Sequence, residues 1–163
     1  MQPRHRAKPQ LWRAGLEIAC LGQMQWQKDA CHHFQVTASN RSFAGKVQIF
    51  DRVERIHDYA DLLHGFLNSV SDTREVRLGE LDLPSSFGGV QLRFFCKNSA
   101  GQATVEIYFD AQAEMDTHLK VERKAQSARF YGDFHAVDFD HFVRELRRLT
   151  GQTGESAWLR FQE

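Results

Sequence analysis

The sequence predicts an α+β fold: an antiparallel β-sheet of about six to eight strands with two amphipathic helices, in the order β-β-α-β-β-β-β-α. Three observations support this. Apolar and polar residues alternate over several runs that short turn sequences join, which is typical of antiparallel strands with one buried face. Segments 53–70 and 138–149 instead repeat apolar residues every three or four positions, as amphipathic helices do. Runs of strands separated by single helices are typical of α+β proteins rather than doubly wound α/β proteins.

Length and composition indicate one globular domain without an excess of positive or negative charge. The chain has 163 residues, of which 42% are hydrophobic and 26% are charged. We expect a mobile basic N-terminal tail over residues 1–15 and a single α+β domain over residues 16–163. The 21 basic and 21 acidic residues give a formal net charge of zero. This balance argues against a dedicated partner among nucleic acids or membrane surfaces.

An edge strand and a hairpin are predicted before residue 51. The run 16–21 is short and mostly apolar, which predicts an edge strand, and segment 22–29 after it is largely polar. Residues 33–37 then alternate, residues 40–41 suit a turn, and residues 43–50 alternate again. Alternation on both sides of a short turn predicts an antiparallel hairpin.

The first helix is predicted to follow Asp51, whose side chain could cap it. Its apolar residues recur with helical spacing at Val53, Ile56, Tyr59, Ala60, Leu63, Phe66, Leu67 and Val70. Acidic side chains lie mainly along the other side, where Glu54, Asp58 and Asp61 form a wet acidic face. Gly65 disfavours helix by about 1 kcal/mol relative to Ala, so we expect an irregular last turn.

The clearest local signal is a second hairpin. After a weak strand over 75–81 and a loop over 83–89, apolar residues alternate through 90–96 and again through 103–109. Residues 97–101 between these runs have turn chemistry. One face of this hairpin is predicted to be buried.

A further strand and the second helix are predicted near the C-terminus. Leu119 and Val121 could mark a short strand, and residues 128–136 alternate clearly. Asp138 is predicted to cap the helix, with Val137 and Phe142 as a hydrophobic staple. Arg144, Arg147 and Arg148 fall in the last turns, where they complement the helix dipole more readily than they form a nucleic-acid site. Residues 158–161 either dock as a last strand or fray.

A metal site or bound cofactor is not expected. Cys31, His32 and His33 are adjacent, but neighbouring strand residues point to opposite faces and cannot converge easily. The zinc spacings CxxC and HExxH are missing. Three cysteines cannot all pair, and the chain carries neither an export signal nor an apolar run long enough for a membrane span. We therefore expect a cytoplasmic protein with free cysteines.

Catalytic machinery is not expected either. Ser85 and Ser86 lack the nucleophile elbow, and Cys96 falls on the inward face of a predicted strand. His135 and His141 flank Asp138, but an Asp near the start of a helix usually acts as a cap. The glycines fit neither GxGxxG nor a P-loop. These patterns predict that the chain is not an enzyme.

One predicted strand face combines aromatic rings with arginines. Its outward positions are Arg93, Phe95, Tyr108, Arg129 and Tyr131, with Glu106, Asp110, Asp133 and His135 among them. Aromatic residues and arginine are enriched in protein–protein contacts, while the interspersed acids argue against polyanion binding. Two interpretations stay open with equal weight. The face binds a protein partner, or the N-terminal segment or a helix of the same chain covers it.

The order of these segments resembles the WapI-type immunity proteins, small bacterial domains whose family is otherwise of unknown function. The resemblance covers roughly residues 31–150 and depends on these segments: Phe43–Phe50, a helix ending Leu62–Phe66, Val90–Phe95, Ala100–Ile107, Ala128–Phe130 and Asp138–Leu146. It implies a non-enzymatic cytoplasmic protein that binds and blocks a cognate polymorphic toxin.

The resemblance leaves the binding surface and the class of function open. A nuclease toxin with a basic active site would favour the acidic patch Glu54, Asp58 and Asp61. That patch competes with the aromatic strand face. The alternative function is a small-molecule-binding or regulatory module with its ligand between sheet and helix, which needs an apolar cavity of roughly several hundred Å³. The sequence also leaves a homodimer open.

Overall fold

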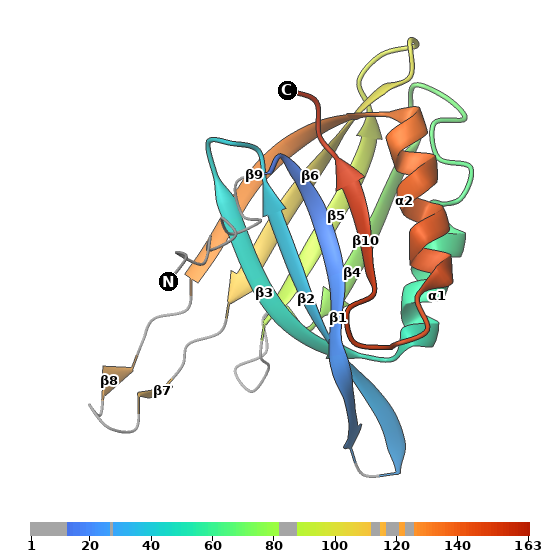
Figure 1. Cartoon of the computed structure of the whole chain (residues 1–163). Coiled ribbons are helices and arrows are strands. Elements are labelled where there is room, and N and C mark those ends of the chain that lie inside the picture. Colours follow the sequence, from blue (N-terminus) through green and yellow to red (C-terminus); the bar gives the residue numbers. More distant parts are fainter. Residues whose placement is uncertain (1–12, 27, 82–87, 112–114, 117–120, 123–125) are drawn as a thin grey trace, which may run out of the picture.

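The computed structural model describes residues 13–26, 28–81, 88–111, 115–116, 121–122 and 126–163. It confirms the α+β class with antiparallel strands and two helices (Figure 1). Within the described residues, eight strands form two four-stranded sheets in the chain order βββαββββαβ, and a short pair, β7 (Met115–Asp116) and β8 (Val121–Glu122), stands apart. Compared with the predicted order, the structure adds one strand before the first helix and one after the second.

The first sheet, sheet A, has the order β10-β1-β2-β3. Its strands are β1 (Gly15–Trp26), β2 (Asp29–Ser39), β3 (Ala44–Asp51) and β10 (Ser156–Arg160). The predicted hairpin of β2 and β3 is confirmed. The prediction of an edge strand at 16–21 is wrong, because β10 docks on the outer side of β1. The polar stretch 22–29 is also strand in large part, since β1 continues to Trp26 beside β2.

The second sheet, sheet B, has the order β4-β5-β6-β9. Its strands are β4 (Thr73–Gly79), β5 (Gly89–Cys96), β6 (Gln102–Ala111) and β9 (Gln126–His135). The hairpin of β5 and β6 and the strand at 128–136 match the predicted alternation. Residues 83–87 of the predicted loop and Leu119 lie outside the described residues.

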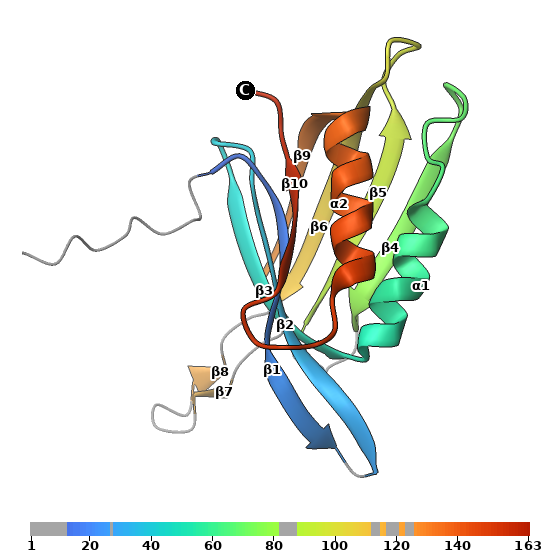
Figure 2. The same cartoon turned by 45° about the vertical axis from the view of Figure 1, so that its right-hand side comes forward.

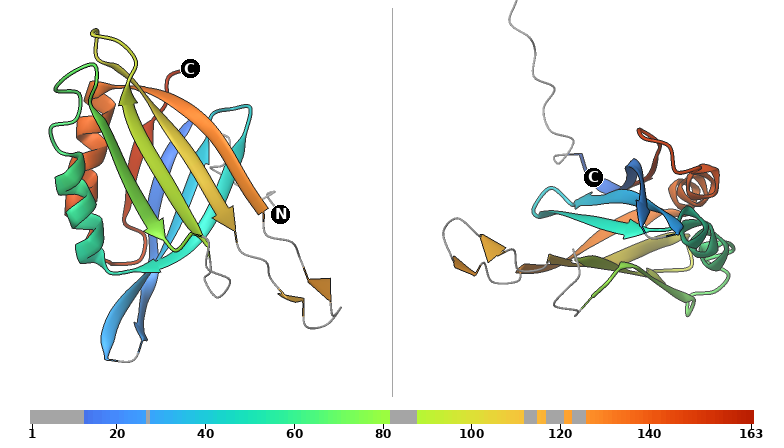
Figure 3. Two further views of the ribbon diagram at one scale, coloured as in Figure 1. Left: turned by 180° about the vertical axis from the view of Figure 1, so that it is seen from behind. Right: turned by 90° about the horizontal axis from the view of Figure 1, so that it is seen from below.

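Each helix carries the chain from one sheet to the other. Helix α1 (Val53–Leu63) follows β3 of sheet A and precedes β4 of sheet B, and helix α2 (Ala136–Arg148) returns the chain from β9 to β10. The helices lie side by side and close one open side between the two sheets (Figure 2; Figure 3, right). Both helices therefore pack at the edges of the sheets and leave the outer faces of the sheets uncovered by helix.

The helix ends differ from the predicted caps. The N-cap of α1 is Arg52 without a side-chain cap, and Asp51 Oδ1 instead accepts the Arg52 N–H at 2.9 Å. The N-cap of α2 is His135, because β9 runs directly into the helix. Asp138 therefore lies within the first turn, and Val137 is 70% exposed and forms no staple.

The first helix ends earlier than the apolar stripe suggests. It stops at Leu63, and Gly65 takes φ +74°, a left-handed conformation that glycine adopts without steric cost. Phe66 still reaches the core, whereas Val70 is 64% exposed. The irregular end that Gly65 predicts is confirmed, and residues 64–70 form turns.

The two sheets and two helices enclose one apolar core. Seven residues predicted to share it are each at most 4% exposed: Phe94, Val105, Ile107, Phe130, Phe134, Phe142 and Leu146. Of the three residues predicted on the opposite side of these strands, Arg93 and Arg129 are exposed and Glu106 is partly buried. Phe66, Phe94, Phe134 and Phe139 contact one another with ring centroids 5.0–6.2 Å apart. Edge-to-face and offset ring contacts of this kind add to burial alone.

On three sheet edges, a backbone group is hydrogen-bonded by another part of the chain. The Trp158 N–H of β10 donates to Glu145 Oε2 of α2 at 2.8 Å. On β4, the Tyr59 hydroxyl of α1 donates to the Arg77 carbonyl. On β9, the Asp133 carbonyl accepts the Gln162 N–H at 2.8 Å. These contacts satisfy backbone groups that an edge strand otherwise leaves open to another chain.

Residues 1–12 of the predicted N-terminal tail lie outside the described residues, which begin at Arg13. Ala14 is buried, and its carbonyl accepts the Phe161 N–H at 3.3 Å. The Arg13 guanidinium lies 4.7 Å from the Trp158 ring centroid. Among the described residues, neither helix has the length and apolar character that crossing a bilayer would require.

Candidate partner surface

The outer face of sheet B is the surface that the sequence singled out. This face lies away from sheet A, and in the described part of the chain no helix or strand lies across it (Figure 3, left). The strand register arranges twelve of these residues in three rows across β4, β5, β6 and β9: Thr73, Phe95, Thr104 and Asp133; Glu75, Arg93, Glu106 and Tyr131; Arg77, Gln91, Tyr108 and Arg129. We call this set the outer face of sheet B.

The middle row is held together by one carboxylate. Glu106 Oε2 accepts hydrogen bonds from Arg93 Nη2 at 3.3 Å and from the Tyr131 hydroxyl at 2.8 Å. The bond from Tyr131 to this carboxylate stabilises the neutral phenol, and it is the largest cause of the raised pKa of Tyr131. The Glu106 side chain is only 12% exposed, so its two partners cover it. This network fixes the positions of an arginine and a tyrosine ring at the centre of the face.

The aromatic rings are accessible from solvent to different degrees. Tyr131 is 48% exposed, whereas Phe95 and Tyr108 are half-buried. The Arg93 guanidinium lies 5.9 Å from the Phe95 ring centroid, and that of Arg129 lies 5.1 Å from the Tyr108 centroid. Such cation–π contacts hold both partners in place. The rings are thus partly shielded by their own neighbours and not by a helix.

Most charges on this face are already paired. Arg77 Nε lies 3.1 Å from Glu75 Oε1, and Lys97 Nζ lies 2.7 Å from Asp133 Oδ2. Burial raises the pKa of Asp133, but hydrogen bonds from Lys97 and the Thr104 hydroxyl outweigh it and hold the pKa below its ordinary value.

Arg129 differs from the other cations of the outer face of sheet B. Within the part of the chain that the structure describes, no carboxylate lies within salt-bridge distance of its guanidinium, which stacks on Tyr108. Its side chain is exposed. Among the described residues, Arg129 is therefore a cation at the edge of an aromatic surface whose guanidinium donors pair with no carboxylate.

Asp110 and His135 were also expected on this face, and the register places them in its alternation, at either end of the three rows. Asp110 pairs with Gly89 and Ser127 and is only 8% exposed, whereas His135 pairs with Gln102, is exposed and is also the N-cap of α2. Five residues of the face were not singled out from the sequence: Thr73, Glu75, Arg77, Gln91 and Thr104. The alternation of the weak strand at 75–81 could have identified Glu75 and Arg77.

The acidic side of α1 is a separate surface. Glu54, Asp58 and Asp61 are all exposed, as predicted. Asp61 Oδ1 accepts a hydrogen bond from Arg147 of α2 at 2.8 Å, so one of the three charges is balanced within the molecule. Helix α1 lies at the side of the two sheets and does not merge with the outer face of sheet B (Figure 3). The sequence-predicted site residues thus form two groups.

The Cys31-His32-His33 segment follows the strand alternation. His32 is buried and its Nδ1 accepts the Val53 N–H at 3.3 Å, while His33 stacks on Phe50 at 4.6 Å between centroids. Among the described residues, no three side chains of His, Cys, Asp or Glu gather as a metal site would require. Ser85 and Ser86 lie outside those residues.

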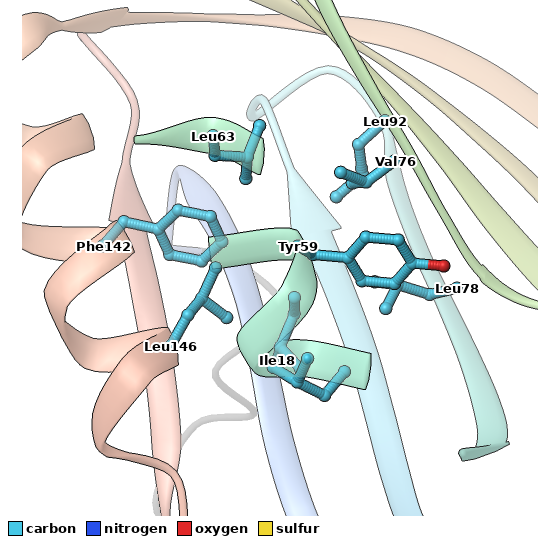
Figure 4. Close-up of a pocket in the computed structure, with 9 residues that line it drawn as sticks. Ile18, Tyr59, Leu63, Val76, Leu78, Leu92, Phe142 and Leu146 are labelled. Atoms are coloured by element: carbon cyan, nitrogen blue, oxygen red, sulfur yellow. The ribbon is translucent and has the colours of Figure 1, made fainter. Parts of the chain in front are cut away.

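The space between α1, α2 and the sheets is small. A cavity of about 10 Å³ lies among the apolar side chains of Ile18, Ile56, Tyr59, Leu63, Val76, Leu78, Leu92, Phe142 and Leu146 (Figure 4). This volume matches about one water-sized probe, far below the few hundred Å³ of a typical ligand site. A small molecule could bind here only if the helices moved away from the sheets.

Comparisons with known proteins give no relative for this chain. No family model matches it, and neither the curated proteins nor the solved structures contain a match.

Proposed function

We propose that this protein is a non-enzymatic binding domain that neutralises a cognate bacterial toxin by docking it on the outer face of sheet B. The observation that supports a binding role is a strand face with accessible rings and paired charges, across which no described helix or strand lies. Exposed aromatic surface of this kind tends to mark an interaction site. The toxin as partner rests on the resemblance to WapI-type immunity proteins.

The contacts within the face suit a binding surface that is ready before the partner arrives. Arg93, Glu106 and Tyr131 already hold one another, so docking would immobilise few further side chains. Pre-organisation lowers the entropic cost of association. Tyr131 is the most exposed of the three rings and is the leading anchor.

Arg129 suggests what the partner presents. Its guanidinium can form a bidentate bond with a carboxylate while it stays stacked on Tyr108. We therefore expect an Asp or Glu of the toxin at this position, beside an apolar contact with Tyr131. Glu54 and Asp58 on α1 are the second candidate surface, and they suit a basic partner.

A protein partner is favoured over a small ligand because the cavity between the helices and the sheets is too small for a ligand. The alternative function places its ligand between sheet and helix, and the apolar space lined by Phe142 and Leu146 there holds about 10 Å³. The outer face of sheet B needs no rearrangement to be reached.

The experiment is a binding and rescue assay with the proteins encoded next to this gene. Each protein encoded by a neighbouring gene is expressed alone and together with this protein, and the growth of the host cells is compared. The affinity of each purified pair is then measured by calorimetry. Tyr131→Ala should weaken binding by about 2 kcal/mol or more, which is roughly thirtyfold in Kd. Val137→Ala, at an apolar residue of α2 that is 70% exposed against 48% for Tyr131, is the control and should leave the affinity unchanged.

Two results would overturn the proposal. If none of the proteins encoded next to this gene is both toxic and bound by this protein, the toxin assignment is wrong. If a partner binds but Tyr131→Ala and Arg129→Ala leave Kd unchanged while Asp58→Asn weakens it, the surface is the acidic side of α1 instead.

A further inference from the structure

The two longest strands of sheet A extend beyond the rest of the sheet. β10 pairs with β1 only from Gly15 to Ala19, and β3 pairs with β2 only as far as His32. Beyond these points β1 and β2 continue as a two-stranded ribbon with the pairs Met24 and Cys31, Gln25 and Ala30, and Trp26 and Asp29. Figures 1 and 2 show this ribbon projecting past the ends of both neighbouring strands.

Within the described residues, the outer edge of β1 in the ribbon has no adjacent strand. The loop before β10 still reaches Leu21, whose carbonyl accepts the Thr153 hydroxyl at 3.3 Å. From Gly22 to Trp26, no backbone hydrogen bond to a third strand is found among the described residues. Leu21 and Met24 are 37% and 42% exposed. A two-stranded ribbon without a third strand is only marginally stable in water.

This edge also lacks the usual protection. On the edge of β10, the Trp158 N–H donates to Glu145, and carbonyls on the edges of β4 and β9 accept hydrogen bonds from Tyr59 and Gln162. Edge strands that stay unpaired are commonly protected by charged residues or proline. The segment Leu-Gly-Gln-Met-Gln-Trp at 21–26 contains neither.

The composition of the segment suits pairing with itself. In a two-fold antiparallel pair, each residue faces a residue of the same segment, so a charged strand would bring like charges together. Centred on Met24, the pairing places Gln23 opposite Gln25 of the second copy, and two amide side chains can hydrogen-bond to each other. Both glutamines are exposed.

We propose that the edge of β1 at residues 22–26 pairs with the same edge of a second copy of this chain. The product is a four-stranded antiparallel sheet in the order β2-β1-β1-β2, which passes the size at which a sheet becomes stable and covers Met24. The inference does not depend on the proposed function, since this dimer leaves the outer face of sheet B free.

The test is the association state of the full chain by sedimentation equilibrium between about 1 and 100 µM, the range of moderate affinities. The wild type should be a dimer in the upper part of this range. Gln23→Lys/Gln25→Lys puts four ammonium groups across the two-fold axis and should raise the dimer Kd by at least about tenfold. Gln126→Lys/Ser127→Lys adds the same charge at exposed residues of β9 and should leave Kd unchanged.

A charge-swap mixture separates this pairing from general charge repulsion. Gln23→Glu/Gln25→Glu should also be monomeric alone, and an equimolar mixture with the lysine variant should restore the dimer. A wild type that stays monomeric at the highest concentration would overturn the proposal. So would a lysine variant that still dimerises with its circular dichroism spectrum unchanged.

Discussion

The contact between Gly132 and Phe161 holds the C-terminal segment on sheet B, and a single methyl group should disrupt it. Gly132 lies buried in the middle of β9, opposite Val105 of β6. A Cβ added there would lie 2.3 Å from Phe161 Cε2 and 2.4 Å from its Cζ. The Phe161 ring is 2% exposed and follows β10 of the other sheet. Glycine at this position therefore permits the two sheets to meet.

Gly132→Ala should destabilise the protein. Overpacking of a core typically costs about 1–3 kcal/mol, whereas replacing glycine within a strand returns about 0.5–1 kcal/mol of backbone entropy. Since the ring is enclosed and cannot swing away freely, we expect a net loss of about 1–2 kcal/mol. Urea unfolding followed by far-ultraviolet circular dichroism measures this. Gly22→Ala is the matched control, because its Cβ would meet only Thr153 Oγ1 at 3.6 Å.

A double-mutant cycle assigns the effect to this contact. Phe161→Ala alone should cost about 3–5 kcal/mol through the cavity it leaves. In Gly132→Ala/Phe161→Ala the new methyl enters vacated space, so the double variant should be more stable than the sum by about 1–2 kcal/mol. Gly132→Ala with wild-type stability, or strict additivity in the double variant, would refute the reasoning.

Three further variants test the electrostatics with the same unfolding assay. Burial raises the pKa of the Asp51 carboxyl. At a pH above this raised pKa the buried carboxylate destabilises the folded state, whereas at a pH below the ordinary pKa the carboxyl is neutral in both states and costs nothing. Asp51→Asn should therefore raise the urea midpoint at neutral pH but not in acid. Hydrogen bonds, chiefly the one from the Thr150 hydroxyl, lower the pKa of Glu155. The Glu155 carboxylate therefore stabilises the folded protein fully above its ordinary pKa, and this stabilisation is lost as the pH falls through the lowered pKa. Glu155→Gln should therefore lower the midpoint at neutral pH, with a difference that shrinks in acid. Arg147→Ala should cost at most about 1 kcal/mol, because its pair with Asp61 is exposed.

Alternation in the sequence was sufficient for most of sheet B. Residues 90–96, 103–109 and 128–136 each have one apolar face, so their period of two determines both the buried set and the outward set. The prediction of Phe95, Tyr108 and Tyr131 as outward residues follows from this alone and agrees with the register. The exposed acids of α1 were predictable for the same reason, from the helical period.

Long-range contacts explain what could not be predicted. Nothing local to Leu16 shows that Leu159 pairs with it, so β1 looked like an edge strand. A glycine such as Gly132 inside a strand pattern signals a close approach, but not that Phe161 is its neighbour. Asp51 and Asp138 were both predicted as N-caps, because the sequence does not show how far the strand before each helix continues. The N-caps are Arg52 and His135 instead. That no described carboxylate pairs with Arg129 became visible only once the cross-strand partners were known.

The central claim is that a partner docks on the outer face of sheet B, and the chain offers a direct probe because it has only three tyrosines. Tyr108 and Tyr131 lie on this face, while Tyr59 lines the interior cavity beside α1. Fluorine NMR of 3-fluorotyrosine-labelled protein should give one signal from each. On addition of the toxin encoded beside this gene, we predict that the Tyr108 and Tyr131 signals shift or broaden while that of Tyr59 stays in place. A bound partner that leaves both of these signals unchanged would contradict the account.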